Sequence, residues 1–308
     1  MILQTGRSLK EESEAVIQPK KKKKLLTAKS TPYFFIGPAL LLFLAFTVYP
    51  IIASFLLSFK TKVMGEFTFS GLANYTRLFS DPLFYKALGN TFIILIVQVP
   101  IMLLIAVILA VFLNSTLLKM KGFYRVAFFT PAVTSLVASS VIFVLMLNTD
   151  YGLINYLLAS IGVEKVGWLT DPFWARVSLI VVTTWRWTGY NMVILLAGLQ
   201  SIPHSLYEAA SIDGAGSIRK FFTITIPQLK PVLLFTFILS TIGSFQLFDE
   251  PYNLTSGGPN NATLTLTYYL YNQAFGYFDF GYASAIAYVI VIFIAFFSWI
   301  QFKVVRDD

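Results

Sequence analysis

The stretch LGNTFIILIVQVPIMLLIAVILAVFL, residues 88–113, contains no charged side chain. An α-helix needs about 20 predominantly apolar residues to cross the ~30 Å hydrocarbon core of a bilayer, so this stretch is long enough to span a membrane. Five further apolar stretches follow the same pattern. The six predicted spans are Tyr33–Phe59, Leu88–Leu113, Phe123–Leu147, Phe173–Leu199, Pro231–Phe248 and Tyr282–Phe302.

The composition of the whole chain agrees with a membrane protein. Charged residues make up 12% of the 308 residues, about half of the ~25% of a typical soluble protein, and hydrophobic residues make up 56%. The mean hydropathy is +0.72, which is more apolar surface than one globular core could bury. We therefore predict an all-α integral membrane protein with six transmembrane helices. The chain has no cysteine, which excludes disulfides and thiolate metal sites.

The basic residues predict the orientation in the membrane. The formal net charge is +8, and the first 30 residues contain the run Lys20–Lys24 with no aromatic residue among the basic ones. Such a tail, directly before an apolar stretch, suits anionic membrane lipid better than nucleic acid. If the N-terminus is inside, most Lys and Arg fall on inner segments, as the positive-inside rule requires. Both termini are therefore predicted to be cytoplasmic.

The predicted organisation has three parts: a basic cytoplasmic tail (1–30), a first transmembrane helix with its outer loop (31–87), and a transmembrane core (88–303). The inner loop at 200–231 is long for a connection between the fourth and fifth spans. Ser205 and Glu208 have the spacing of a capping box, and Gly214 would end the helix that they begin. We predict a short cytoplasmic helix between spans 4 and 5.

This loop also carries a family resemblance. The run YEAASIDGA at residues 207–215, followed by Ile224 and Ile226-Pro227, resembles the EAA loop of the permease subunits of type I ABC importers. The only departure is Ile226, where that family usually has Leu. The sequence of this loop is most similar to the carbohydrate-uptake branch of the family, the maltose and glycerol phosphate permeases. The segments GLANY at 71–75 and TSGGP at 255–259 resemble the same branch. The similarity runs from residue 33 to 303.

The resemblance implies how the chain is driven. In this family the short helix docks into an ATPase subunit. The implied coupling residues are Glu208, Ala209, Ala210, Asp213 and Gly214. The chain contains no G-x-x-x-x-G-K-[ST] sequence, so ATP and Mg²⁺ would bind to partner ATPase subunits and this chain would hold no cofactor and catalyse no reaction. The implied partners are an ATPase homodimer, a second homologous permease and an extracytoplasmic solute-binding protein, in the cytoplasmic membrane of a prokaryote.

One ionisable residue lies in the middle of a predicted span. Arg186 is flanked by Trp185 and Trp187, and a charge at that depth costs ~3 kcal/mol or more unless a partner or a wet cavity offsets it. Aromatic rings beside a guanidinium can hold a sugar ring and its hydroxyls. With the resemblance to maltose-type permeases, the predicted substrate-pathway residues are Arg186, Trp187, Tyr190, Asn191, Ser240, Gly243, Ser244 and Leu247. The alternative is a structural arginine paired with a carboxylate such as Asp249, with the small residues packing helices together.

The predicted function is that of a permease subunit importing a sugar, a disaccharide or an oligosaccharide. The positive charge of Arg186 leaves an anionic sugar derivative or glycerol phosphate as an alternative substrate. A self-sufficient secondary transporter would show inverted repeats or carboxylates at depth, and neither is found in the sequence. An intramembrane enzyme is disfavoured because there is one histidine, His204, which we expect in a loop, and no paired carboxylate in the spans.

Overall fold

The computed structural model describes residues 31–63, 65–115 and 117–306, and these residues are largely helical. The predicted basic tail at 1–30 lies outside the described residues. The chain divides into two compact units, residues 1–53 and 54–308, which are considered separately.

The described part of the first unit is one apolar helical run. It consists of α1 (Thr31–Phe43), the π-helical segment η1 (Leu44–Val48) and the first part of α2 (Tyr49–Ser58). Tyr49 N–H bonds to the carbonyl of Leu44, and this wider turn accommodates Pro50, which has no N–H of its own. The run Pro32–Ser58 has 27 residues and a mean hydropathy of 2.4, as expected for a helix that crosses a membrane.

After the last residues of α2, the second unit forms a small antiparallel hairpin, an exception to the all-α prediction. The hairpin strands are β1 (Lys60–Val63) and β2 (Glu66–Phe69), with Lys60 opposite Phe69. The helices that follow are α3 (Ala73–Phe79), α4 (Pro82–Asn114), α5 (Lys121–Val133), α6 (Leu136–Met146), α7 (Leu153–Ser160), α8 (Pro172–Gln200), α9 (His204–Ile212), α10 (Ser217–Lys220), α11 (Ile226–Phe245), α12 (Asp249–Thr255), α13 (Leu266–Tyr271) and α14 (Phe280–Arg306), with π-helical segments η2 (Phe221–Thr225) and η3 (Asn272–Gly276).

Fewer helices than predicted have the length and composition of a membrane span. Within the described residues these are Pro32–Ser58, Pro82–Asn114, Ser217–Phe245 and Phe280–Val304, and α5 with α6 makes a fifth if a bent pair counts as one span. By length and composition, the described residues therefore contain four or five spans where six were predicted. The predicted fourth span is one uninterrupted helix, α8, but its polar side chains leave it outside this set.

The predicted continuous span Phe123–Leu147 is wrong. The helix breaks at Thr134 and Ser135, and α5 and α6 meet at an angle of 94°. Both residues have extended backbone, with ψ of 143° and 130°. Pro131 lies just before the break and cannot donate a helical hydrogen bond, which weakens the last turn of α5.

Two Asp-Pro pairs fix where the long helices begin. Asp81 Oδ1 accepts from the backbone N–H of Leu83 at 2.9 Å, and Pro82 occupies the first helical turn of α4. Asp171 Oδ1 accepts from the N–H groups of Phe173 and Trp174 at the start of α8. An aspartate cap followed by proline is a strong start signal, so α4 begins before the apolar stretch itself.

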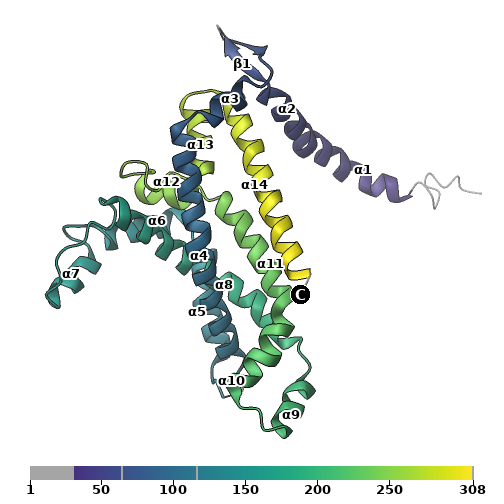
Figure 1. Ribbon diagram of the computed structural model, residues 1–308, viewed down its shortest axis with the longest axis vertical. Helices are drawn as coiled ribbons and strands as arrows, with labels where there is room; N and C mark the ends of the chain where they lie inside the picture. The colour runs from purple at the N-terminus through teal and green to yellow at the C-terminus, as the bar shows by residue number, and fades with distance from the viewer. Residues whose placement is uncertain (1–30, 64, 116, 307–308) are drawn as a thin grey trace, which may run out of the picture. The chain divides into compact units, whose positions relative to one another are not determined.

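The long helices of the second unit pack against one another around α4 and α8. Helix α4 contacts α8 and α11, α5 contacts α8, and α14 lies along α11 (Figure 1). A Cβ atom at Gly189 of α8 would lie 1.8 Å from the carbonyl oxygen of Phe128 in α5. Only glycine therefore allows these two helices to cross at this distance.

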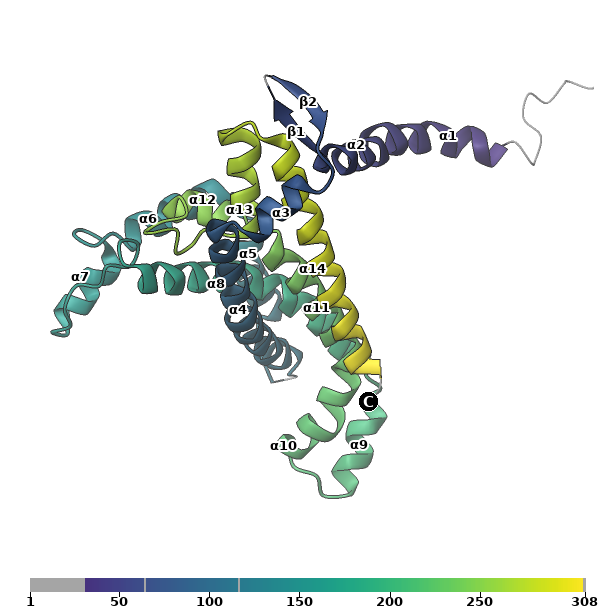
Figure 2. The ribbon, with the colours of Figure 1, turned by 45° about the horizontal axis from the view of Figure 1, so that its top comes forward.

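The two ends of the second unit differ. In both views α9 and α10 lie beyond one end of α11, while α3, α13 and the hairpin lie at the opposite end (Figures 1 and 2). The pocket described next lies between these ends.

Candidate functional site

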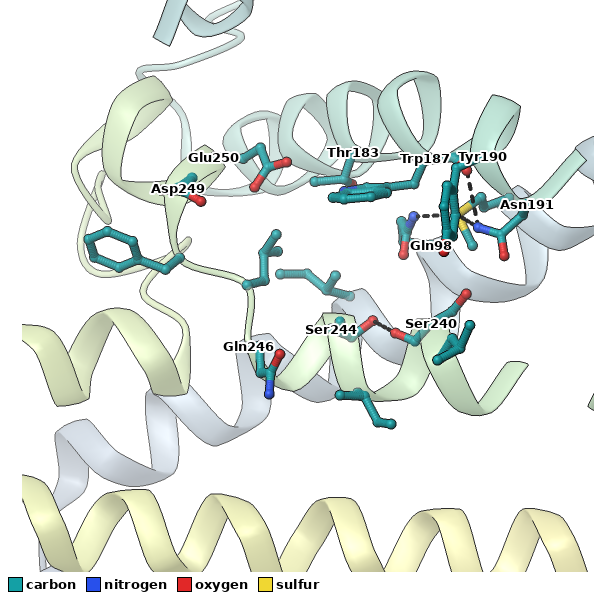
Figure 3. Close-up of a pocket in the computed structure, with 17 residues that line it drawn as sticks. Gln98, Thr183, Trp187, Tyr190, Asn191, Ser240, Ser244, Gln246, Asp249 and Glu250 are labelled. Atoms are coloured by element: carbon teal, nitrogen blue, oxygen red, sulfur yellow. Dashed lines mark hydrogen bonds between the residues drawn. The ribbon is translucent and has the colours of Figure 1, made fainter. Parts of the chain in front are cut away.

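A pocket of about 380 Å³ opens between α4, α8, α11 and the start of α12 (Figure 3). Every predicted pathway residue except Arg186 lines it. These residues are Trp187, Tyr190 and Asn191 from α8, and Ser240, Gly243, Ser244 and Leu247 from α11 and the turn after it. The residues that share a helical face in the sequence therefore lie around one pocket, on two facing helices.

The α8 wall presents two aromatic rings and an amide. The rings of Trp187 and Tyr190 lie 6.1 Å apart, edge to face, and each side chain is more than a third exposed. Asn191 Nδ2 donates to the carbonyl of Trp187 at 3.1 Å and lies 3.5 Å from Met102 Sδ of α4. The Oδ1 atom of Asn191 is buried and has no hydrogen-bond partner among the described residues. This wall can stack against a ring and accept a hydrogen bond.

The α11 wall presents small side chains to the pocket. Ser244 Oγ donates back to the carbonyl of Ser240 at 2.9 Å. A Cβ atom added to Gly243 would meet nothing within 4 Å, so this glycine faces open space and makes no close helix contact. At this position the small residue leaves room in the pocket, and packing does not require it.

Arg186 lies behind the pocket wall, which differs from the prediction. Its Nε is 3.7 Å from Oε1 of Glu250, and both side chains are less than a tenth exposed. Its Nη2 donates to the carbonyl of Thr134 at 3.1 Å. Thr134 is at the break between α5 and α6, so Arg186 satisfies a carbonyl that the broken helix leaves free. The alternative prediction was a structural ion pair between Arg186 and a carboxylate such as Asp249. The observed partner of Arg186 is Glu250, the residue after Asp249.

Several pocket residues were not predicted. The most polar of them are Gln98, Thr183, Gln246, Asp249 and Glu250. Gln98 carries the clearest sequence signal, since an amide within an otherwise apolar span usually faces a partner or a cavity. Glu250 follows the predicted fifth span Pro231–Phe248 in the sequence, and it is buried because α12 packs against α8 and α6. Burial raises the pKa of Glu250, and Arg186 acts in the opposite direction.

A hydrogen-bonded cluster of one aspartate and two tyrosines holds the N-terminal end of α4. Asp81 accepts hydrogen bonds from the hydroxyls of Tyr269 in α13 and Tyr282 in α14, the latter at 2.6 Å. Burial acts to raise the pKa of Asp81, but these bonds outweigh it and hold the pKa below its ordinary value. Burial and the bond to Asp81 raise the pKa of Tyr269 to about 12. The cluster ties α4, α13 and α14 together at the start of α4.

The short helix predicted in the inner loop exists as α9, but it begins differently. It starts at His204, after Pro203, and Ser205 does not cap it, so the capping box is wrong. Glu208 Oε1 instead lies 3.0 Å from Nδ1 of His204, one turn earlier, and His204 is a helix residue where a loop was expected. The end is as predicted, because Gly214 adopts a left-handed φ of +75°.

Helix α9 and the segment after it are exposed. Of the predicted coupling residues, Glu208, Ala209, Asp213 and Gly214 are exposed and Ala210 is half-buried. Large apolar side chains are exposed beside them, namely Ile212, Ile218 and Phe222. Apolar groups of this size that gather on a surface are typical of a docking site for another protein.

Two contacts connect this surface to the helix that forms the pocket wall. Tyr207 Oη lies 2.9 Å from Oγ1 of Thr225, and Lys220 Nζ donates to Ser211 Oγ at 2.6 Å. Ser217–Phe245 is one helical stretch, so both contacts end on the element that carries Ser240 and Ser244.

Among the described residues, no group of three His, Asp or Glu side chains could hold a metal ion.

The fold and these two features define a multi-span helical membrane protein with a pocket among its helices and an exposed connecting helix. Residues 68–307 match the model of the family "binding-protein-dependent transport system inner membrane component", and the chain belongs to this family. The predicted resemblance to ABC importer permeases and the multi-pass membrane location are thereby confirmed.

Individual relatives agree. Over 280 residues the chain is 50% identical to the lactose transport system permease protein LacF of Rhizobium radiobacter, with 89% of this chain and 94% of that protein covered. It is 42% identical to the arabinooligosaccharides transport system permease protein AraP of Bacillus subtilis, with 89% and 88% covered. The same fold is found in a bacterial ABC transporter involved in the import of the acidic polysaccharide alginate, with a TM-score of 0.79, 21% identity, and coverage of 91% of this chain and 97% of that chain.

Proposed function

We propose that this chain is a permease subunit of an ATP-binding-cassette importer that moves a disaccharide or oligosaccharide across the cytoplasmic membrane of a prokaryote. The observation that carries the proposal is its 50% identity to a lactose permease over most of both chains. The pocket supports it, because its volume lies in the range of small-molecule sites and its walls combine aromatic rings with uncharged hydrogen-bonding groups.

The pocket residues have complementary roles in this proposal. Trp187 and Tyr190 stack against the apolar faces of sugar rings. Asn191 and the two serines of α11 exchange hydrogen bonds with hydroxyl groups of the sugar. Gly243 supplies the space and Leu247 an apolar edge. Arg186 acts from behind the wall by fixing Glu250.

The topology completes six spans. Helix α8 is the fourth, since its polar face lines the pocket and need not meet lipid, and the bent pair α5–α6 is the third. Both termini then lie in the cytoplasm with α9. The basic residues near α9, namely Arg219, Lys220 and Lys230, fall on the inner side as the positive-inside rule expects.

Helix α9 is the proposed coupling element. Glu208, Ala209, Ala210, Asp213 and Gly214 face an ATPase subunit of a homodimer that binds ATP and Mg²⁺. A second homologous permease completes the pathway, and an extracytoplasmic binding protein delivers the sugar. When the ATPases close, a displacement of α9 passes through the contacts of Tyr207 and Ser211 to the helical stretch that carries the α11 wall.

The test is ATP-dependent uptake of a labelled sugar panel by the complete assembly in proteoliposomes. Gly214→Asp should abolish uptake while ATP hydrolysis continues, because the side chain opposes the left-handed turn on the docking surface. Gly162→Asp is the matched control, since Gly162 has a φ of +80° and open surroundings but lies in the α7–α8 loop. Uptake by this chain alone, without an ATPase, would instead indicate a self-sufficient transporter.

A further inference from the structure

A second cavity, of about 570 Å³, lies at the end of the second unit that is opposite α9 and α10. Its walls come from α3, the start of α4, the loop between α12 and α13, α13 itself, and η3 with the residues that follow it (Figure 1). Most of the lining side chains are polar or aromatic. Of the described residues, none lines both this cavity and the pocket between α4, α8 and α11.

Two carboxylates in the wall are already paired and hold the cavity in shape. Asp81 accepts hydrogen bonds from the hydroxyls of Tyr269 and Tyr282. Asp279 Oδ2 accepts from Nη1 of Arg77 at 2.7 Å, and its Oδ1 accepts from the backbone N–H of Tyr282 at 3.2 Å. These contacts fix α3, α4, α13 and α14 around the cavity, and a ligand does not need to compete for them.

Other groups of the wall have hydrogen-bonding capacity left. Gln273 is only 6% exposed, and its side-chain amide makes no hydrogen bond within the described part of the chain. Arg77 directs one of its five donors to Asp279, and its side chain is 53% exposed. Asn261 is exposed at the edge of the cavity. A nine-tenths buried amide without a protein partner is costly, so a ligand that exchanges hydrogen bonds with Gln273 is favoured.

An aromatic ring stands at the edge of the same cavity. Tyr277 is 73% exposed, although its backbone is held by a hydrogen bond from its N–H to the carbonyl of Asn272 at 2.9 Å. The wider turn of η3, which contains Gln273, is of a kind that is frequent at functional sites. An exposed ring beside free amides and a guanidinium can hold a sugar by stacking and by hydrogen bonds to its hydroxyls. The volume is also within the range of small-molecule sites.

One loop separates this cavity from the pocket. Asn90 of α4 is 3% exposed and donates to the carbonyls of Asn261 at 2.8 Å and Leu264 at 2.9 Å. Thr265 Oγ1 donates to the carbonyl of Leu247 at 2.6 Å. Leu264 lines the second cavity and Leu247 lines the pocket, so the loop at 261–265 forms a wall of the cavity and also packs against the pocket.

We propose that this second cavity is a carbohydrate-binding site at the outer mouth of the pathway. Gln273 and Asn261 exchange hydrogen bonds with sugar hydroxyls, Arg77 donates to them, and Tyr277 stacks on a sugar ring. The inference rests on the proposed function, which puts this end of the chain outside the cell because α9 is inside. A sugar bound here lies on the far side of the loop at 261–265 from the pocket.

The experiment maps where a photoreactive sugar attaches. Diazirine-labelled di- and trisaccharides whose parent sugars are taken up in proteoliposomes are titrated onto the complete importer in lipid nanodiscs and irradiated, and labelled peptides are identified by mass spectrometry. The wild type should be labelled saturably in residues 261–279 as well as in 187–191. Gln273→Leu and Tyr277→Ala should each raise the sugar concentration that half-saturates labelling of 261–279 at least about fivefold, and should leave that of 187–191 within about twofold.

Controls separate the site from general damage. Tyr156→Ala in α7 is matched to Tyr277→Ala, because Tyr156 is 72% exposed and lines neither cavity, and it should change no labelling. Gln273→Leu should keep the wild-type Tm, since the amide has no protein partner to lose.

Two results would overturn the inference. One is the absence of saturable label in residues 261–279. The other is label there that Gln273→Leu and Tyr277→Ala leave unchanged, including the case in which these variants weaken only the binding of the solute-binding protein. If the complete importer takes up no sugar of the panel, the proposed function itself is contradicted.

Discussion

The buried pair Arg186–Glu250 gives the sharpest stability prediction. Either Glu250→Gln or Arg186→Met leaves one charge buried without its partner, a situation that costs ~3–5 kcal/mol. Glu250→Gln should fall near the lower end because Arg186 keeps its hydrogen bond to Thr134. The double variant removes both charges and leaves mainly an unpaired carbonyl, which costs ~1–3 kcal/mol. The two effects should therefore be far from additive.

The assay is thermal unfolding of the four proteins in one detergent. At roughly 2 °C per kcal/mol for a chain of this size, each single variant should lower the Tm by about 6–10 °C, and the double variant should lower it by less than either single variant. The exposed pair Arg77–Asp279 is the control, and Asp279→Asn should cost under ~1 kcal/mol. Additive losses for Arg186→Met and Glu250→Gln would refute the argument that Glu250 neutralises this arginine.

Three further predictions concern the pocket, a helix crossing and the hydrogen-bonded cluster around Asp81. Gly243→Leu should leave the Tm within ~2 °C but reduce sugar uptake at least about tenfold, since the new side chain fills open space in the pocket; normal uptake would remove α11 from the pathway. Gly189→Ala should lower the Tm by several degrees and the membrane yield, because its Cβ would overlap the Phe128 carbonyl, and an unchanged Tm would contradict this crossing. Hydrogen bonds hold the pKa of Asp81 below its ordinary value near 3.8, so the ionised carboxylate stabilises the fold above that pH, and this stabilisation is lost as the pH falls through the pKa of the folded state. The wild type should therefore be more stable than Asp81→Asn by ~1–3 kcal/mol at pH 7, and the difference in Tm should shrink below about pH 4. A difference in Tm that does not depend on pH would contradict this reasoning.

The membrane spans could be predicted from sequence where hydropathy alone decides them. The stretches ending near Ser58 and Asn114, and the C-terminal helix, were all recognised as long apolar segments. The break at Thr134 could not be predicted in this way. Its free carbonyl is satisfied by Arg186 from another helix, and no local pattern reports such a long-range partner.

In the connecting helix α9, the end could be predicted from the sequence and the start could not. Gly214 ends α9 because glycine alone adopts a positive φ without strain, a purely local property. Its start was misplaced, because the capping-box spacing of Ser205 and Glu208 competes with a helix that begins after Pro203 and pairs Glu208 with His204. Spacing identified the element, and the competing side-chain contact decided its first turn.

The sequence by itself determined the class of protein, the long apolar helices, the exposed loop with Glu208, and the faces of α8 and α11 that carry the pocket residues. These follow from composition and helical periodicity, which are properties of neighbouring residues. Only the tertiary structure decided that Arg186 stands behind the wall and that Glu250 lines the pocket. Their pairing depends on α12 folding back across α8, and the charge that a ligand meets depends on which buried groups have already neutralised each other.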